Sequence, residues 1–165
     1  MKFQPKATEK RYYLAYGSNM NLAQMQCRCP RAQNLGPVTL PRYTLVFNGV
    51  ASIEQSADST VDGLLWGITP QCERRLDQYE GYPRLYDKHT VTVYDADGAA
   101  YEAMVYIMTP ENSTPAIPSR YYYDSIMDGY IANGIPTDRL EQALNETVNI
   151  CHKYKFRQYY GSFAT

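Results

Sequence analysis

The strand-like segments of this chain lie in its first two thirds, and the longer helical segments follow them. A regular alternation of strand and helix, the pattern of parallel sheets, is missing. The sequence therefore predicts an α+β fold, a small, curved, mostly antiparallel sheet or barrel of about six strands flanked by helices. The expected strands cover residues 13–16, 38–40, 43–48, 61–68, 89–94 and 100–108, and residues 51–56 form a short strand or an extended loop.

Capping residues mark the clearest expected helix, which covers residues 70–80. Thr69 is a good N-cap, Pro70 suits the first helical position, and Gly81 is a typical C-cap residue. These signals predict both ends of this helix from local chemistry alone. The other expected helices cover residues 21–26, 121–133 and 137–154, and turns are expected at residues 57–60 and 95–98.

The length and charge of the chain limit the number of domains and the kinds of partner that we expect. At 165 residues, one domain over residues 1–165 is expected, with a solvated tail at residues 1–11. The formal net charge of −1 gives no electrostatic case for binding nucleic acid or acidic membranes. No apolar run approaches the ~18 residues of a membrane span, and the first residues lack the apolar core of a secretory signal. We therefore expect a cytoplasmic protein that binds neither nucleic acid nor membrane.

The cysteines and histidines do not form a recognisable metal-binding pattern. The spacing of Cys27, Cys29, Cys72 and Cys151 matches no zinc motif. Only two histidines are present. We therefore expect reduced thiols, no metal and no other cofactor.

The stretch YYLAYGSNM has the pattern of a buried strand that ends in a tight polar turn before a helix. Gly17 can adopt backbone angles closed to other residues, and Ser18 and Asn19 are good turn and N-cap residues. The free N–H groups of such a turn attract anions. The loop is predicted to hold the charged end of a small substrate, and the alternative is an ordinary strand-to-helix cap.

Glu80 is the candidate for proton transfer. It ends the expected helix, where the negative end of the helix dipole disfavours a carboxylate. The chain has 17 tyrosines, and three of them, Tyr79, Tyr82 and Tyr86, stand close to Glu80 in sequence. Partial burial among these rings and the dipole would both raise the pKa of Glu80 from about 4.3 toward the range useful for general acid–base catalysis. The alternative is an exposed glutamate at a helix end.

Several segments, in the same order, resemble the γ-glutamylcyclotransferase family. They are YGSNM, the segment Ala51-Ser52-Ile53, a G-x-x-W-G-I strand, LDQYEG, and Pro118-Ser119-x-x-Tyr122 before SIMDGYIANGIP. The last is similar to the family's G-A-x-x-x-G-L-P stretch. The resemblance covers residues 13–144. The spacing from Glu80 to Tyr86 is slightly tighter than in the animal enzymes, and Met20 replaces the commoner leucine. These departures leave open the branch of the family and so the leaving group.

The resemblance implies an intramolecular reaction without metal, nucleotide or covalent nucleophile. The α-amine of a γ-glutamyl group attacks its own γ-carbonyl, the ring closes to 5-oxoproline, and an amino acid or amine departs. Glu80 is then the general acid/base. The implied substrate-binding residues are Tyr16, Gly17, Ser18, Asn19, Met20, Tyr86 and Tyr122. Backbone N–H groups of residues 16–19 would hold the substrate carboxylate and carbonyl. The expected partner is a small γ-glutamyl compound, and monomer and homodimer both stay open.

Two other interpretations belong to different classes. One is a non-catalytic small-molecule-binding or scaffold domain on the same fold, and the carboxylate at position 80 argues against it. The other is a cysteine-dependent enzyme that uses Cys27 or Cys29, or a redox pair formed by the two. Alkylation would abolish the activity of such an enzyme and leave a Glu80-dependent one nearly intact.

Overall fold

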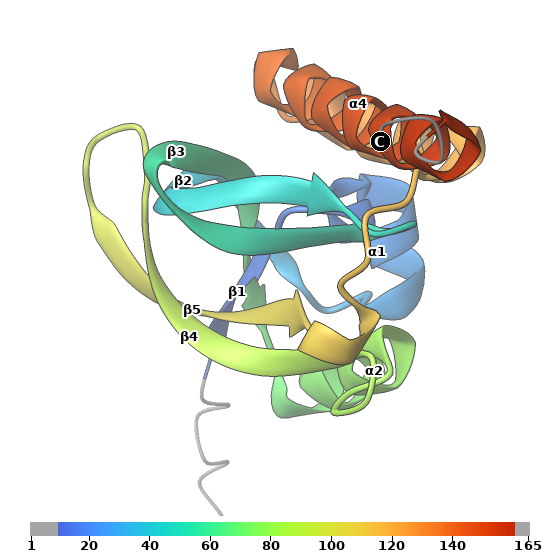
Figure 1. Ribbon diagram of the computed structural model, residues 1–165. Helices are drawn as coiled ribbons and strands as arrows, with labels where there is room; N and C mark the ends of the chain where they lie inside the picture. The colour runs from blue at the N-terminus through green and yellow to red at the C-terminus, as the bar shows by residue number, and fades with distance from the viewer. Residues whose placement is uncertain (1–9, 161–165) are drawn as a thin grey trace, which may run out of the picture.

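The protein is built on a closed five-stranded barrel (Figure 1). The computed structural model describes the backbone of residues 10–160 and the side chains of residues 10–155. The strands lie in the order β1-β3-β2-β4-β5, and all neighbouring pairs are antiparallel except β1 with β5. They are β1 (Arg11–Ala15), β2 (Gln33–Phe47), β3 (Ala51–Ile68), β4 (Tyr86–Tyr94) and β5 (Ala100–Met108). The predicted α+β fold is confirmed, with five strands instead of about six.

Strands β2 and β3 are longer than the sequence predicts, and each takes in two of the predicted strand segments. The predicted turn at residues 57–60 is wrong. The pairing register shifts between Pro41 and Tyr43 on β2, so that residues 56–59 of β3 stand opposite Arg42 alone. Arg42 has a left-handed φ of 65°. The turn-like residues thus form a bulge that bends the strand without ending it.

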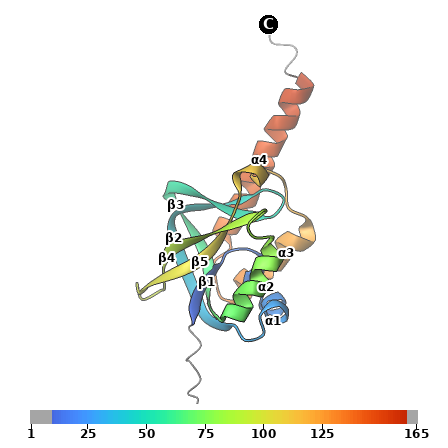
Figure 2. The ribbon, with the colours of Figure 1, turned by 90° about the horizontal axis from the view of Figure 1, so that it is seen from below.

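The helices lie outside the barrel wall (Figure 1). They are α1 (Leu22–Arg28), α2 (Pro70–Glu80), α3 (Arg120–Ala132) and α4 (Asp138–Tyr160), with short 3₁₀ turns η1 (Ser18–Met20) and η2 (Pro110–Asn112). The predicted ends of α2 are confirmed, since the Thr69 side chain accepts from the N–H of Cys72 and Gly81 has a φ of 63°. Helices α1, α2 and α3 gather at one side, while α4 projects beyond the barrel (Figure 2).

Both chain ends differ from their predicted limits. Arg11 already belongs to β1, and the rest of the predicted tail falls almost wholly outside the described residues. At the other end, α4 continues to Tyr160, six residues past its predicted limit at residue 154. Within the described part of the chain, no helix is long and apolar enough to cross a membrane.

A disulfide joins Cys29, at the end of α1, to Cys72, in the first turn of α2. The Cα atoms of the two residues lie 5.2 Å apart although 43 positions separate them in the sequence. The expectation of four reduced thiols is therefore wrong for this pair, because the packing of α1 beside α2 is not visible in cysteine spacing. Cys29 is thus bonded to Cys72 and not to the exposed Cys27, with which it was considered as a redox pair. The cytoplasmic location stays a prediction.

Helix α3 packs directly against the η1 turn through Gly129. A Cβ atom at this position would lie 2.7 Å from both the carbonyl carbon and the carbonyl oxygen of Met20. On the same helix end, the Asn133 side chain donates to the Met20 carbonyl at 3.3 Å. Because these contacts involve backbone atoms of the turn, they fix its position relative to the helix.

Gly129→Ala is expected to lower the free energy of unfolding by roughly 1–3 kcal/mol, as overpacking does. Alanine in place of glycine within a helix would otherwise stabilise it by up to about 1 kcal/mol. Urea denaturation measures the effect, with Asp128→Ala, an exposed change on the same helix, as the control. An unchanged or increased stability of Gly129→Ala would contradict the close packing of α3 on the turn.

Candidate active site

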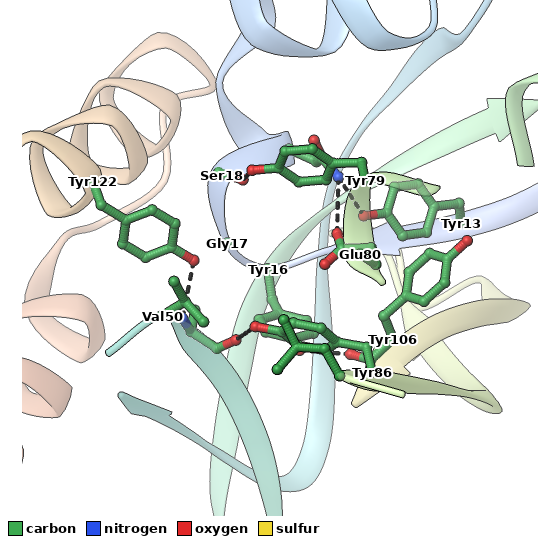
Figure 3. A pocket seen from close by; sticks show the side chains of 13 residues that line it. Tyr13, Tyr16, Gly17, Ser18, Val50, Tyr79, Glu80, Tyr86, Tyr106 and Tyr122 are labelled. Carbon is green, nitrogen blue, oxygen red and sulfur yellow. Dashed lines mark hydrogen bonds between the residues drawn. The ribbon is translucent and has the colours of Figure 1, made fainter. Parts of the chain in front are cut away.

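A cavity of about 170 Å³ opens at the end of β1, where the chain enters the η1 turn. Its walls come from β1, the η1 turn, the start of β3, the end of α2, β4, β5 and α3 (Figure 3). The lining residues are Tyr13, Tyr16, Gly17, Ser18, Asn19, Val50, Ala51, Tyr79, Glu80, Leu85, Tyr86, Tyr106 and Tyr122. The structure thus brings Glu80 and the loop of residues 17–19 together across one small cavity.

Glu80 is partly buried at the last position of α2. Burial raises the pKa of its carboxyl group from 4.5 to about 7, and the positive charge of Arg28 opposes this rise. The sequence predicted a raised pKa from the helix end and the neighbouring rings. Removal from water is the cause of the rise here. A carboxyl group with a pKa near 7 can both accept and donate a proton at neutral pH.

The side-chain amide of Asn19 connects the loop to Glu80. Its nitrogen donates to Oε1 of Glu80 at 3.3 Å and to the hydroxyl oxygen of Tyr13 at 2.9 Å. Its oxygen accepts from the Arg28 guanidinium at 2.6 Å. Since a guanidinium can only donate, this contact fixes which end of the amide faces Glu80. The backbone carbonyl of Asn19 in turn accepts from the Trp66 indole N–H at 3.1 Å.

Arg28 is a site residue that the sequence did not single out. Its guanidinium lies 3.5 Å from the centre of the Tyr79 ring, donates to Asn19 Oδ1, and contacts Ser18 Oγ at 3.5 Å. Arg28 also donates to Gln24, one helical turn earlier, at 2.9 Å. In the sequence, an arginine on a short helix nine positions after Asn19 does not indicate by itself that it belongs to a site. Its role depends on how α1 packs against α2.

Three residues at the η1 turn, Gly17, Ser18 and Asn19, line the cavity. The first N–H groups of a helical turn have no acceptor within it. Within residues 10–160, no backbone hydrogen bond is made by the N–H groups of Gly17, Ser18 or Asn19. The Ser18 hydroxyl lies 3.0 Å from the hydroxyl of Tyr79. Met20, also predicted to bind substrate, is fully buried and does not line the cavity.

Tyr86 and Tyr122 both engage the backbone of Ala51. The Tyr86 hydroxyl donates to the Ala51 carbonyl at 2.6 Å, so its proton is not available to a ligand. The Tyr122 hydroxyl accepts from the Ala51 N–H at 2.9 Å, and among the described residues its own proton has no acceptor. Tyr13 is placed similarly, since its hydroxyl accepts from Asn19. Burial raises the pKa of Tyr13 and of Tyr122, so both remain protonated donors.

Two further tyrosines of the cavity wall use their hydroxyl groups to hold the wall in place. Tyr16 donates to the backbone carbonyl of Tyr106, on β5. Tyr106 donates to Oδ1 of Asp77 at 2.6 Å, and Asp77 also pairs with Lys88 at 3.0 Å. This chain of contacts fastens α2 to the barrel three residues before Glu80. The sequence predicted Tyr16 as a substrate contact, and the structure places its ring in the cavity wall with its proton already in use.

Within the described residues, no group of three or more His, Cys, Asp or Glu side chains is placed to hold a metal ion. The polar atoms of the cavity are those of the carboxyl group, amides and hydroxyls described above. Such a set can hold an anionic group on N–H donors and exchange a proton with an amine.

Replacing Arg28 with glutamine is expected to raise the pKa of Glu80 further, because the positive charge that opposes the rise is removed. A ¹³C NMR titration of the Glu80 carboxyl carbon measures the midpoint, expected near 7 in the unmodified protein. Arg31→Gln removes the same charge outside the cavity and serves as the control. A midpoint that stays in place or falls in Arg28→Gln would show that this contact does not tune Glu80.

The comparisons with known proteins agree on one family. The family model for "Gamma-glutamyl cyclotransferase, AIG2-like" matches residues 13–124. Gamma-glutamylcyclotransferase of Homo sapiens is 29% identical over 143 residues, which cover 79% of this chain and 75% of the relative. The Bos taurus protein of the same name is 30% identical over 139 residues, covering 76% and 73%.

A solved structure described as "Gamma-glutamyl cyclotransferase" superposes with a TM-score of 0.75 at 28% sequence identity. The match covers 82% of this chain and 86% of that chain. Sequence and structure therefore agree, and this protein belongs to the gamma-glutamyl cyclotransferase, AIG2-like family.

Proposed function

We propose that this protein is a γ-glutamylcyclotransferase that converts a γ-glutamyl compound into 5-oxoproline and a free amine or amino acid. The observation that carries the proposal is that one cavity is lined by Glu80, whose pKa is raised to about 7, and by residues 17–19, whose N–H groups make no backbone hydrogen bond among the described residues. The match to the family and the names of the relatives support it.

The loop binds the α-carboxylate of the substrate in this proposal. N–H groups at the start of a helical turn suit an anion, and the Ser18 hydroxyl adds a further polar group. The turn needs little reorganisation on binding, because Trp66 and Asn133 hold its carbonyls and Gly129 packs on its backbone. Fixing the carboxylate at this end folds the flexible γ-glutamyl chain toward a ring.

Glu80 moves the proton. The α-amine of the substrate is protonated near neutral pH and cannot attack until it loses that proton. The Glu80 carboxylate takes it, and the amine nitrogen then forms a bond with the γ-carbonyl carbon. When the tetrahedral intermediate collapses, Glu80 returns the proton to the leaving nitrogen as the amide C–N bond breaks. The ring nitrogen gives up its second proton, through the Glu80 carboxylate, to the released amine, so the products are neutral lactam and protonated amine. Atoms and protons balance without an oxidant or reductant.

The developing negative charge on the γ-carbonyl oxygen needs donors fixed in advance. Tyr122 and Tyr13 have hydroxyl protons without acceptors among the described residues, and both line the cavity. They are the candidate donors, together with the loop N–H groups. Tyr86, whose proton is used on Ala51, instead shapes the cavity wall and can only accept.

The Glu80→Gln variant is expected to keep the shape of the site and lose its proton shuttle, so kcat should fall by about 10²- to 10⁴-fold. The assay follows 5-oxoproline release from a panel of γ-glutamyl amino acids, γ-glutamyl amines and glutathione. Glu54→Gln, an exposed change on β3, is the matched control. Near-normal activity of Glu80→Gln would overturn the mechanism, and no release by either protein from any substrate would favour the binding-domain alternative.

Activity is expected to fall as the pH drops through about 7, because only the ionised form of Glu80 can take the proton. Below this point kcat/KM should decrease about tenfold per pH unit. In Arg28→Gln this decrease in kcat/KM should begin at a higher pH, since the pKa of Glu80 is then higher. A rate that is flat between about pH 5 and 8 would contradict a proton transfer by Glu80.

A further inference from the structure

A second cavity, of about 180 Å³, has the Cys29–Cys72 disulfide in its wall. It is separate from the active-site cavity and shares no lining residue with it. Its lining residues are Cys29, Pro30, Arg31, Thr69, Gln71, Cys72 and Arg75. The two cysteines are otherwise buried, each less than 5% exposed. We therefore expect a small molecule to approach the disulfide from this cavity.

The charges around this cavity are positive. Arg31 and Arg75 are exposed, and among the described residues neither guanidinium lies within 4.0 Å of a carboxylate. The two acidic residues nearest to Arg75 along α2 are held in other ion pairs. Glu73 pairs with Arg11 and Lys88 at 2.8 and 3.0 Å, and Asp77 pairs with Lys88 at 3.0 Å. An anion that enters the cavity therefore meets two free positive charges.

We propose that this cavity is a thiol–disulfide exchange site for small thiols that carry a carboxylate. The arginines attract the carboxylate, and the thiolate of the same molecule reaches the disulfide. No function is assigned to this disulfide or to this cavity by the reaction proposed above. Exchange here does not depend on the γ-glutamylcyclotransferase activity.

The position of Cys72 on α2 indicates which sulfur is attacked. Cys72 is the third residue of an 11-residue helix whose N-terminus is capped by Thr69, and the positive end of a helix dipole stabilises a thiolate. Cys72 is therefore the better leaving group, and the incoming thiolate attacks Sγ of Cys29. The products are a mixed disulfide on Cys29 and a Cys72 thiolate.

A second molecule of the same thiol completes the reduction. It attacks the sulfur of the bound thiol and releases Cys29 as a thiolate. In total, two small thiols are oxidised to one small disulfide, and the protein disulfide gains two electrons and two protons. The same steps in reverse close the bond again.

The state of the disulfide bears on the active site through Arg28, which precedes Cys29 in the chain. The bond fixes the end of α1 to the start of α2. Arg28, on the first helix, stacks on Tyr79 of the second and donates to Asn19. Opening the bond removes the covalent link between α1 and α2 next to this contact, so we expect Arg28 to hold Asn19 less firmly and the pKa of Glu80 to rise, as in Arg28→Gln.

The exchange is tested by the rate at which air-purified protein is reduced under native conditions. Alkylation and mass spectrometry count the free thiols, expected to rise from the two of Cys27 and Cys151 to all four. The probes are mercaptoacetate (anionic), 2-mercaptoethanol (neutral) and cysteamine (cationic), each normalised to its rate with a neutral small-molecule disulfide. At low ionic strength we expect mercaptoacetate to exceed 2-mercaptoethanol by about threefold to tenfold, and cysteamine to be slowest.

Matched variants assign this preference to the cavity. Arg31→Gln and Arg75→Gln should each reduce the preference for mercaptoacetate, while Arg74→Gln, a neighbouring exposed arginine outside the cavity, should keep it. High salt should remove it in all proteins. Four alkylatable thiols in the untreated protein, reduction only after unfolding, or equal preferences in all four proteins would overturn the proposal.

The link to the active site is measured separately and rests on the proposed function. Reduced protein should lose several-fold in kcat. The fall of its kcat/KM at low pH should move to higher pH, as in Arg28→Gln. Cys72→Ser should have the same kcat and pH profile as reduced protein, and added thiol should not change them. Unchanged kcat and pH profile would overturn the link alone. Inactivity toward every γ-glutamyl compound would overturn the proposed function and leave the exchange site standing.

Discussion

The side-chain amide of Asn19 is the contact on which the rest of the site depends. A single amide accepts from Arg28, donates to Tyr13 and donates to Glu80. It therefore ties together α1, β1 and the end of α2, and its backbone carbonyl is held by Trp66 of β3. Because the amide can satisfy these partners in only one orientation, the loop and the carboxyl group keep a defined relation before any substrate arrives.

The electrostatics of the cavity follow from two opposed effects on Glu80. Removal from water favours the neutral carboxyl group, and the nearby guanidinium favours the ionised one. Burial alone would raise the pKa further, and a directly paired arginine would hold it in the usual range. Arg28 forms no direct ion pair with Glu80 among the described residues and contacts it through Asn19, so its charge opposes the rise only in part. This indirect contact keeps the pKa near neutrality, where a group can both take and return a proton.

Features with local causes could be predicted from the sequence, and features that arise from packing could not. The ends of α2 follow from Thr69 and Gly81, and the strand-to-loop transition follows from the glycine and polar residues after β1. The bulge opposite Arg42 carries turn-like residues, so it was predicted to break the strand. The role of Arg28 and the Cys29 disulfide both depend on α1 lying beside α2, which no periodicity in either helix indicates.

The most direct test of the account is a crystal structure of the Glu80→Gln variant with a γ-glutamyl amino acid bound. The account predicts that the substrate α-carboxylate lies on the N–H groups of residues 17–19. It also predicts that the α-amine lies within hydrogen-bonding distance of the side chain at position 80, with the γ-carbonyl carbon poised for attack by that amine. A substrate bound elsewhere, or bound here with its γ-glutamyl end turned away from both the loop and position 80, would contradict the account.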